Sequence, residues 1–168
     1  MTLNAPLSAI LCDLIVDRRT DVCRALLLEP DIDVKFQTPA GATPLLLAAE
    51  QGLHRLVPLL LALGADPNAI DPFGRTPLMR AARNGDTRIV SILLGQGAAV
   101  NLATRKRAWT ALMWAAASGS TACVRTLIDA GADPGLTNSA GQTALDIARE
   151  SGSRTTEKLL LERMPTPT

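Results

Sequence analysis

The chain has 168 residues, a formal net charge of +1 and a hydrophobic share of 47%. This length suits one domain with a sizeable core, and the near-neutral charge argues against binding nucleic acid or membranes by bulk electrostatic attraction. With two tryptophans, two phenylalanines and no tyrosine, the core must consist mainly of aliphatic side chains. That composition fits thin repeating layers better than one globular centre.

Residues that recur at a step of 33 predict two helix pairs in the first part of the chain, and the first pair is a degenerate unit that acts as the N-terminal cap. The four helices are expected at Leu7–Asp17, Thr20–Leu28, Thr43–Gln51 and His54–Leu63. Residues 1–6 are expected to be disordered. Pro58 lies early in the fourth helix and on its solvent side, so a local irregularity is expected there and not a break.

The segment from Asp71 to Asn101 is the most regular part of the chain. Thr76 is suited to cap the N-terminus of a helix, and Pro77 loses no hydrogen bond at the first helical position. Gly85 ends that helix, where a left-handed conformation favours glycine. An apolar stripe then predicts a second helix; its residues are Ile89, Val90, Leu93 and Leu94.

The last third of the chain predicts two further pairs. Three of their helices are expected at Thr110–Ser118, Thr121–Ala130 and Ser153–Met164. The loop Thr104–Trp109 is one residue longer than its counterpart Asp71–Arg75, and Ala108 replaces the turn glycine. Thr156 and Glu157 stand where earlier units have core residues, which indicates a C-terminal cap.

The same residues recur at a nearly constant step. Threonines that open a helix are spaced 33, 34 and 33 residues apart, at Thr43, Thr76, Thr110 and Thr143. Glycines keep that step at Gly52, Gly85, Gly119 and Gly152, whereas the 33-residue step places Arg19 at this position in the first unit. A period of about 33 residues with a T-P-L-x-x-A-A core is typical of stacked helix pairs.

This pattern closely resembles the ankyrin repeat family over nearly the whole chain. The resemblance implies an all-α solenoid of antiparallel helix pairs joined by short β-hairpin-like loops, and a non-enzymatic protein-interaction module. We expect a single domain at 7–164 and a disordered tail at 165–168. The repeats are expected at about 7–37, 38–70, 71–103, 104–137 and 138–164.

Residues for catalysis or for binding a metal or cofactor are not found in the sequence. His54 is the single histidine, and Cys12, Cys23 and Cys123 occupy core positions of the repeat without C-x-x-C spacing. We therefore expect no enzyme activity, no cofactor and a reducing compartment, which favours a cytoplasmic location. A secretory signal is not evident, and every apolar run is too short to span a membrane.

The middle of the chain combines basic and aromatic residues. Residues 71–107 carry seven basic and two acidic side chains, a net charge of +5, whereas residues 1–70 carry five and eight, a net of −3. Aromatic and arginine side chains are the usual components of binding hot spots. The positions that the resemblance places along a concave groove give the candidate partner-binding residues Phe73, Arg75, Arg80, Arg83, Lys106, Arg107, Trp109 and Trp114.

From these residues we predict a monomeric adaptor, inhibitor or scaffold that binds an acidic and apolar surface or segment of a partner protein. Three alternatives stay open: a microbial effector that uses the same groove on a host protein, nucleic-acid binding through the basic-aromatic strip, and an unseen enzyme. The two tryptophans also suit simple packing between repeats. The basic tip Arg105-Lys106-Arg107 equally suits a solvated turn.

Overall fold

Residues 6–163 of the computed structural model are described, and they form ten helices and no extended strand. The predicted disordered tail, Met164 and residues 1–5 lie outside the described residues. Pro6, predicted as part of the disordered start, contributes to the first helical turn, because its carbonyl accepts a hydrogen bond from the amide of Ala9 at 2.8 Å.

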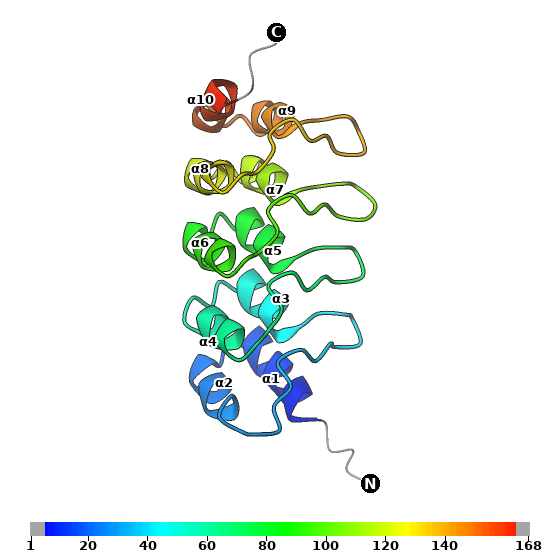
Figure 1. Ribbon diagram of the computed structural model, residues 1–168, viewed down its shortest axis with the longest axis vertical. Helices are drawn as coiled ribbons and strands as arrows, with labels where there is room; N and C mark the ends of the chain where they lie inside the picture. The colour runs from blue at the N-terminus through cyan, green and yellow to red at the C-terminus, as the bar shows by residue number, and fades with distance from the viewer. Residues whose placement is uncertain (1–5, 164–168) are drawn as a thin grey trace.

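The helices form two columns, with the odd-numbered inner helices stacked in one and the even-numbered outer helices in the other, and with loops projecting to one side (Figure 1). Each sequence-defined unit contains one inner and one outer helix. The helices are α1 (Leu7–Val16), α2 (Thr20–Leu26), α3 (Pro44–Glu50), α4 (Leu56–Ala62), α5 (Pro77–Arg83), α6 (Thr87–Gly95), α7 (Ala111–Ala117), α8 (Thr121–Asp129), α9 (Ala144–Glu150) and α10 (Arg154–Arg163).

The repeated threonines cap the inner helices, as the sequence predicts. The Thr76 side chain accepts a hydrogen bond from the amide of Met79 at 3.2 Å, and the threonines before α3, α7 and α9 make the same contact. Each such cap contributes about 1 kcal/mol. The Asp146 carboxylate accepts hydrogen bonds from the hydroxyl and from the amide of Thr143; the amide bond completes a capping box, and both bonds lower the pKa of Asp146.

The solenoid core is aliphatic and continuous from α1 to α10. The paired alanines of the inner helices, such as Ala81 and Ala82, are fully buried, which allows neighbouring inner helices to pack closely. All three cysteines are buried, as predicted. Burial raises the pKa of Cys12 to about 11, with a contribution from Asp13, and also raises the pKa of Cys23.

Pro58 produces a later helix start. The sequence predicts the helix from His54, but α4 begins at Leu56, so Pro58 lies in its first turn. Amides of the first turn have no partner within the helix. The missing N–H of proline therefore removes no hydrogen bond, and the helix is shortened instead of broken.

Among residues 6–163, two residues other than glycine have positive φ. The first is Arg18, with φ of 58°. The 33-residue step places Arg19 at the position of the helix-ending glycines, but α1 ends one residue earlier relative to that step, so Arg18 takes the left-handed conformation instead. The second is Ala108, with φ of 51°, in the position of the turn glycines. Left-handed backbone costs an L-residue about 1–2 kcal/mol, so both turns carry some strain.

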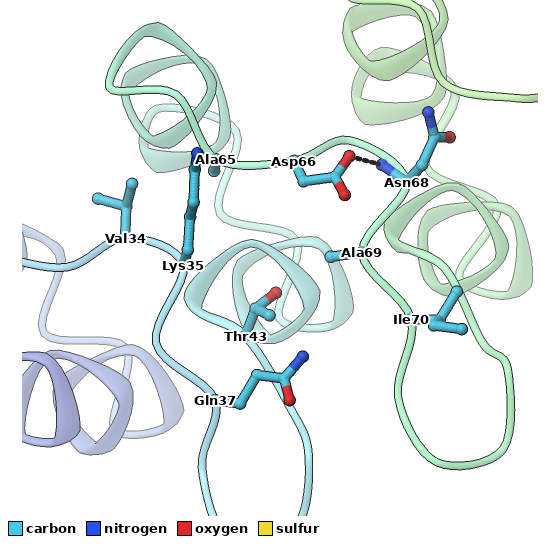
Figure 2. A pocket seen from close by; sticks show the side chains of 9 residues that line it. All are labelled: Val34, Lys35, Gln37, Thr43, Ala65, Asp66, Asn68, Ala69 and Ile70. Carbon is cyan, nitrogen blue, oxygen red and sulfur yellow. Dashed lines mark hydrogen bonds between the residues drawn. The ribbon is translucent and has the colours of Figure 1, made fainter.

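Asparagine clamps connect the loops that follow successive outer helices. The Asn68 side chain donates to the Gly97 carbonyl at 3.3 Å and accepts from the Ala99 amide at 2.7 Å. Asn101 makes the equivalent two bonds one repeat further along. Lys35 holds this position in the first repeat, and there a pocket of about 310 Å³ lies between the loops (Figure 2).

Candidate partner-binding site

The hairpin loops of the third, fourth and fifth repeats are tied together through their backbones. The amide of Arg105 donates to the carbonyl of Phe73 at 3.0 Å, and the amide of Ser139 donates to the carbonyl of Arg107 at 2.9 Å. The loops therefore form one continuous edge (Figure 1). Pro72 has no N–H, so this chain of bonds does not extend to the second repeat.

Asp71 organises the hairpin of the third repeat. Its carboxylate accepts hydrogen bonds from the amides of Phe73 and Arg75, both at 2.9 Å, which fix the turn. The same carboxylate accepts from the Arg75 side chain at 2.6 Å and from Arg80 at 2.8 Å. Burial by itself would raise the pKa of Asp71, but these hydrogen bonds outweigh it and the pKa is lowered.

Arg80 is an internal connector. Its side chain is 9% exposed, and its guanidinium contacts both Asp71 and Glu50, which lies on the inner helix of the preceding repeat. The Nε atom of Arg80 is buried without a hydrogen-bond partner. With its charge already committed inside the protein, Arg80 is not available to a partner carboxylate. The prediction of a partner-facing role for Arg80 therefore does not fit the structure.

Five of the eight candidate residues line one pocket, which we call the arm pocket. It has a volume of about 320 Å³ and lies between the hairpins of the third and fourth repeats. Its lining residues are Phe73, Arg75, Thr104, Lys106, Arg107 and Trp114. Thr104, which the sequence analysis did not single out, holds the fourth hairpin closed by accepting from the amide of Trp109 at 3.0 Å.

The two tryptophans have different positions. Trp114 lines the arm pocket from α7, whereas Trp109 packs against it from outside the pocket lining, with ring centroids 4.5 Å apart. Arg83 flanks the pair, its guanidinium carbon 5.7 Å from the Trp114 ring centre. The indole nitrogen of Trp114 is buried and has no hydrogen-bond partner in the part of the chain that the structure describes. Both rings also contact the core, so packing accounts for part of their role.

Phe73 is the most exposed of these aromatic side chains. It is 57% exposed at the hairpin tip, with the guanidinium of Arg75 at 4.6 Å from its ring centre. Cation–π contact of this kind contributes about 0.5–1 kcal/mol at an exposed site. It also holds the two side chains together as one wall of the arm pocket.

Most of the basic residues between 71 and 107 have no acidic partner. Within the described chain, only Arg75 and Arg80 of this segment form ion pairs. The remaining cations are Arg83, Arg88, Arg105, Lys106 and Arg107. Because Asp86 faces His54 at 2.7 Å and Asp71 is occupied by two arginines, neither acidic residue of the segment neutralises the fourth hairpin tip.

Residues 6–163 contain no group of three or more histidine, cysteine or acidic side chains placed to hold a metal ion. Among these residues there is also no helix with the length and hydrophobicity needed to cross a membrane.

A family model described as Ankyrin repeats (3 copies) matches residues 14–104 and 96–167. The chain belongs to the ankyrin repeat family. Ankyrin repeats are in general protein–protein interaction modules, and the stacked helix pairs with projecting hairpins agree with that family's all-α solenoid.

One curated protein with similarity is the Ankyrin repeat and SAM domain-containing protein 6 of Danio rerio. It is 46% identical over 52 residues, which cover 31% of this chain and 7% of the relative. This ankyrin repeat chain therefore corresponds to a small part of that protein. The similarity supports the repeat assignment, and it transfers no partner or activity.

Proposed function

We propose that this chain binds a partner protein through the hairpins and inner helices of its third and fourth repeats, and so acts as an adaptor, inhibitor or scaffold without catalysing a reaction. The observation that carries the proposal is the arm pocket, where an exposed phenylalanine and a tryptophan meet cations that have no internal partner. Aromatic and arginine side chains of this kind dominate binding energy at interfaces.

The backbone connections between hairpins support this function. Because the fourth hairpin is bonded to both neighbours, its side chains are presented from a fixed edge. A preorganised surface loses less conformational entropy on binding than a loose loop does. The unsatisfied indole nitrogen of Trp114 supports the same proposal, because a buried donor without an acceptor lowers the stability of the unbound chain.

The test is affinity capture from source-cell lysate with protein identification by mass spectrometry. Wild type is compared with Phe73→Ala/Arg107→Ala, two exposed residues whose side chains make no hydrogen bond or ion pair within the described chain. A control variant, Arg88→Ala/Arg125→Ala, removes two exposed cations from α6 and α8. We expect a protein retained by wild type and by the control but lost with the arm-pocket variant. Equal recovery in all three would place binding elsewhere.

A further inference from the structure

We infer that the occupant of the arm pocket is an extended, acidic segment of the partner, which inserts one large apolar side chain between Phe73 and Trp114 and places carboxylates beside Lys106 and Arg107. This inference rests on the proposed function and specifies the partner's chemistry. It follows from the size of the pocket, the backbone bond between its two hairpins and the distribution of charge around it.

The size of the arm pocket is sufficient for one large side chain. Its volume of about 320 Å³ lies at the low end of the range for small-molecule sites, about 300–1,000 Å³. Two aromatic side chains, Phe73 and Trp114, form part of its lining, and the aliphatic stems of the cations add apolar area. One aromatic or branched aliphatic side chain therefore fits both the volume and the apolar part of the lining.

The backbone bond between the two hairpins that bound the arm pocket favours an extended chain over a helix or a folded surface. The hydrogen bond from the Arg105 amide to the Phe73 carbonyl ties the two bounding hairpins together at 3.0 Å. Separating the hairpins to admit a helix would break that bond. In the described chain the amides of Lys106 and Arg107 donate no hydrogen bond, so the tip offers two donors to the carbonyls of an extended segment.

The charge at the tip selects acidic neighbours for the inserted side chain. Arg105, Lys106 and Arg107 are three consecutive exposed cations, and none of them forms an ion pair among the described residues. A partner carboxylate there gains attraction without first displacing an internal one. Opposite charge at an interface rim raises the association rate and the specificity more than it raises the affinity.

The fourth hairpin is also built differently from the others. It has an extra residue, a turn closed by a bond from the Ala108 amide to the Thr104 carbonyl at 3.0 Å, and a non-glycine residue with φ of 51°. This arrangement places Lys106 and Arg107 in the pocket lining. The corresponding loops at 38–42 and 138–142 have the shorter form with glycine and carry no basic residue.

The experiment measures fluorescence anisotropy of a short fluorescein-labelled Gly-Ser peptide with Glu-Glu-Phe-Glu-Glu at its centre. Two control peptides replace either the glutamates with glutamine or the phenylalanine with alanine. We expect both controls to bind about tenfold more weakly. Lys106→Gln/Arg107→Gln should abolish binding of the parent peptide, whereas Arg88→Gln/Arg125→Gln, with the same change in net charge, should retain it.

Several results would overturn the inference. One is an equal loss of affinity in the two variants, which would show that net charge and not the arm pocket attracts the peptide. Another is tighter binding of a labelled single-stranded oligonucleotide of equal charge. A third is self-association in sedimentation that is lost in Lys106→Gln/Arg107→Gln, which would make a second copy the occupant. Absence of peptide binding, with the captured protein still dependent on Phe73 and Arg107, would refute the acidic segment and leave the proposed function standing.

Discussion

The replacement of an asparagine clamp by Lys35 leads to a specific stability prediction. Lys35 has the same local backbone as Asn68, since each amide donates to the aspartate two residues earlier at 2.8 Å. In the next loop the Asp66 amide and the Gly64 carbonyl take no part in a hydrogen bond within the described chain. These two groups correspond to the partners of Asn68, and Lys35→Asn, in the lining of the pocket in Figure 2, should bond both.

The magnitude follows from the two new hydrogen bonds. Each intramolecular hydrogen bond contributes a net 0.5–1.5 kcal/mol or so, and the clamp at Asn68 is exposed, which favours the lower part of that range. We therefore expect Lys35→Asn to raise the free energy of unfolding by about 1 kcal/mol. For a chain of this size that corresponds to an increase in Tm of about 2–4 °C.

The assay is urea and thermal unfolding followed by circular dichroism. The reverse variant, Asn68→Lys, is the matched control, and it should lower the free energy of unfolding by about 1 kcal/mol because it removes two exposed hydrogen bonds, to the Gly97 carbonyl and from the Ala99 amide. Native-state hydrogen exchange should locate the gain of Lys35→Asn in the first two repeats. Unchanged stability in both variants would refute the reasoning that these clamps join the repeats.

Three further outcomes are expected. Asp71→Asn should lower the free energy of unfolding by about 2 kcal/mol at neutral pH. Because folding lowers the pKa of Asp71, the greater stability of wild type is complete above the ordinary pKa of 3.8 and shrinks as the pH falls below that value. Urea titrations across that range check this, and an advantage insensitive to acid would contradict it. Ala108→Gly should stabilise the chain by about 1 kcal/mol in thermal unfolding by relieving its positive φ, so a lower Tm would be contrary evidence. Trp114→Phe removes a buried unpaired N–H, so stability should stay within about 1 kcal/mol of wild type while capture of the partner falls; a large loss of stability would make Trp114 a packing residue only.

The repeat architecture was predictable because it depends on local rules repeated several times. A threonine cap, a proline at the first helical position and a glycine at the helix end each act within a few residues. Their recurrence at a step of about 33 fixes how many units stack and where the helices lie. The two differences are local too. Pro58 delays the start of α4 past His54, and α1 ends one residue earlier relative to that step, so Arg18 and not Arg19 has positive φ.

The candidate site was predictable in part. The sequence brings Phe73, Arg75, Lys106, Arg107 and Trp114 to neighbouring repeat positions, and the structure places these five around one pocket. The repeat pattern of the sequence does not show which cations lack an acidic partner within the described chain. An arginine on an inner helix has the same pattern position whether it faces solvent or a carboxylate one repeat away.

Arg80 illustrates that limit. Its partners lie on different units, with Asp71 on the hairpin of its own repeat and Glu50 on the preceding inner helix. The spacing of 9 residues between Asp71 and Arg80 gave no signal of contact. The sequence by itself thus determined the all-α solenoid, its helix pairs and its caps, because these depend on short-range geometry that every repeat shares. Only the tertiary structure decided which charged and aromatic side chains are occupied by neighbouring repeats and which remain for a partner, because that depends on distances between units that stacking alone sets.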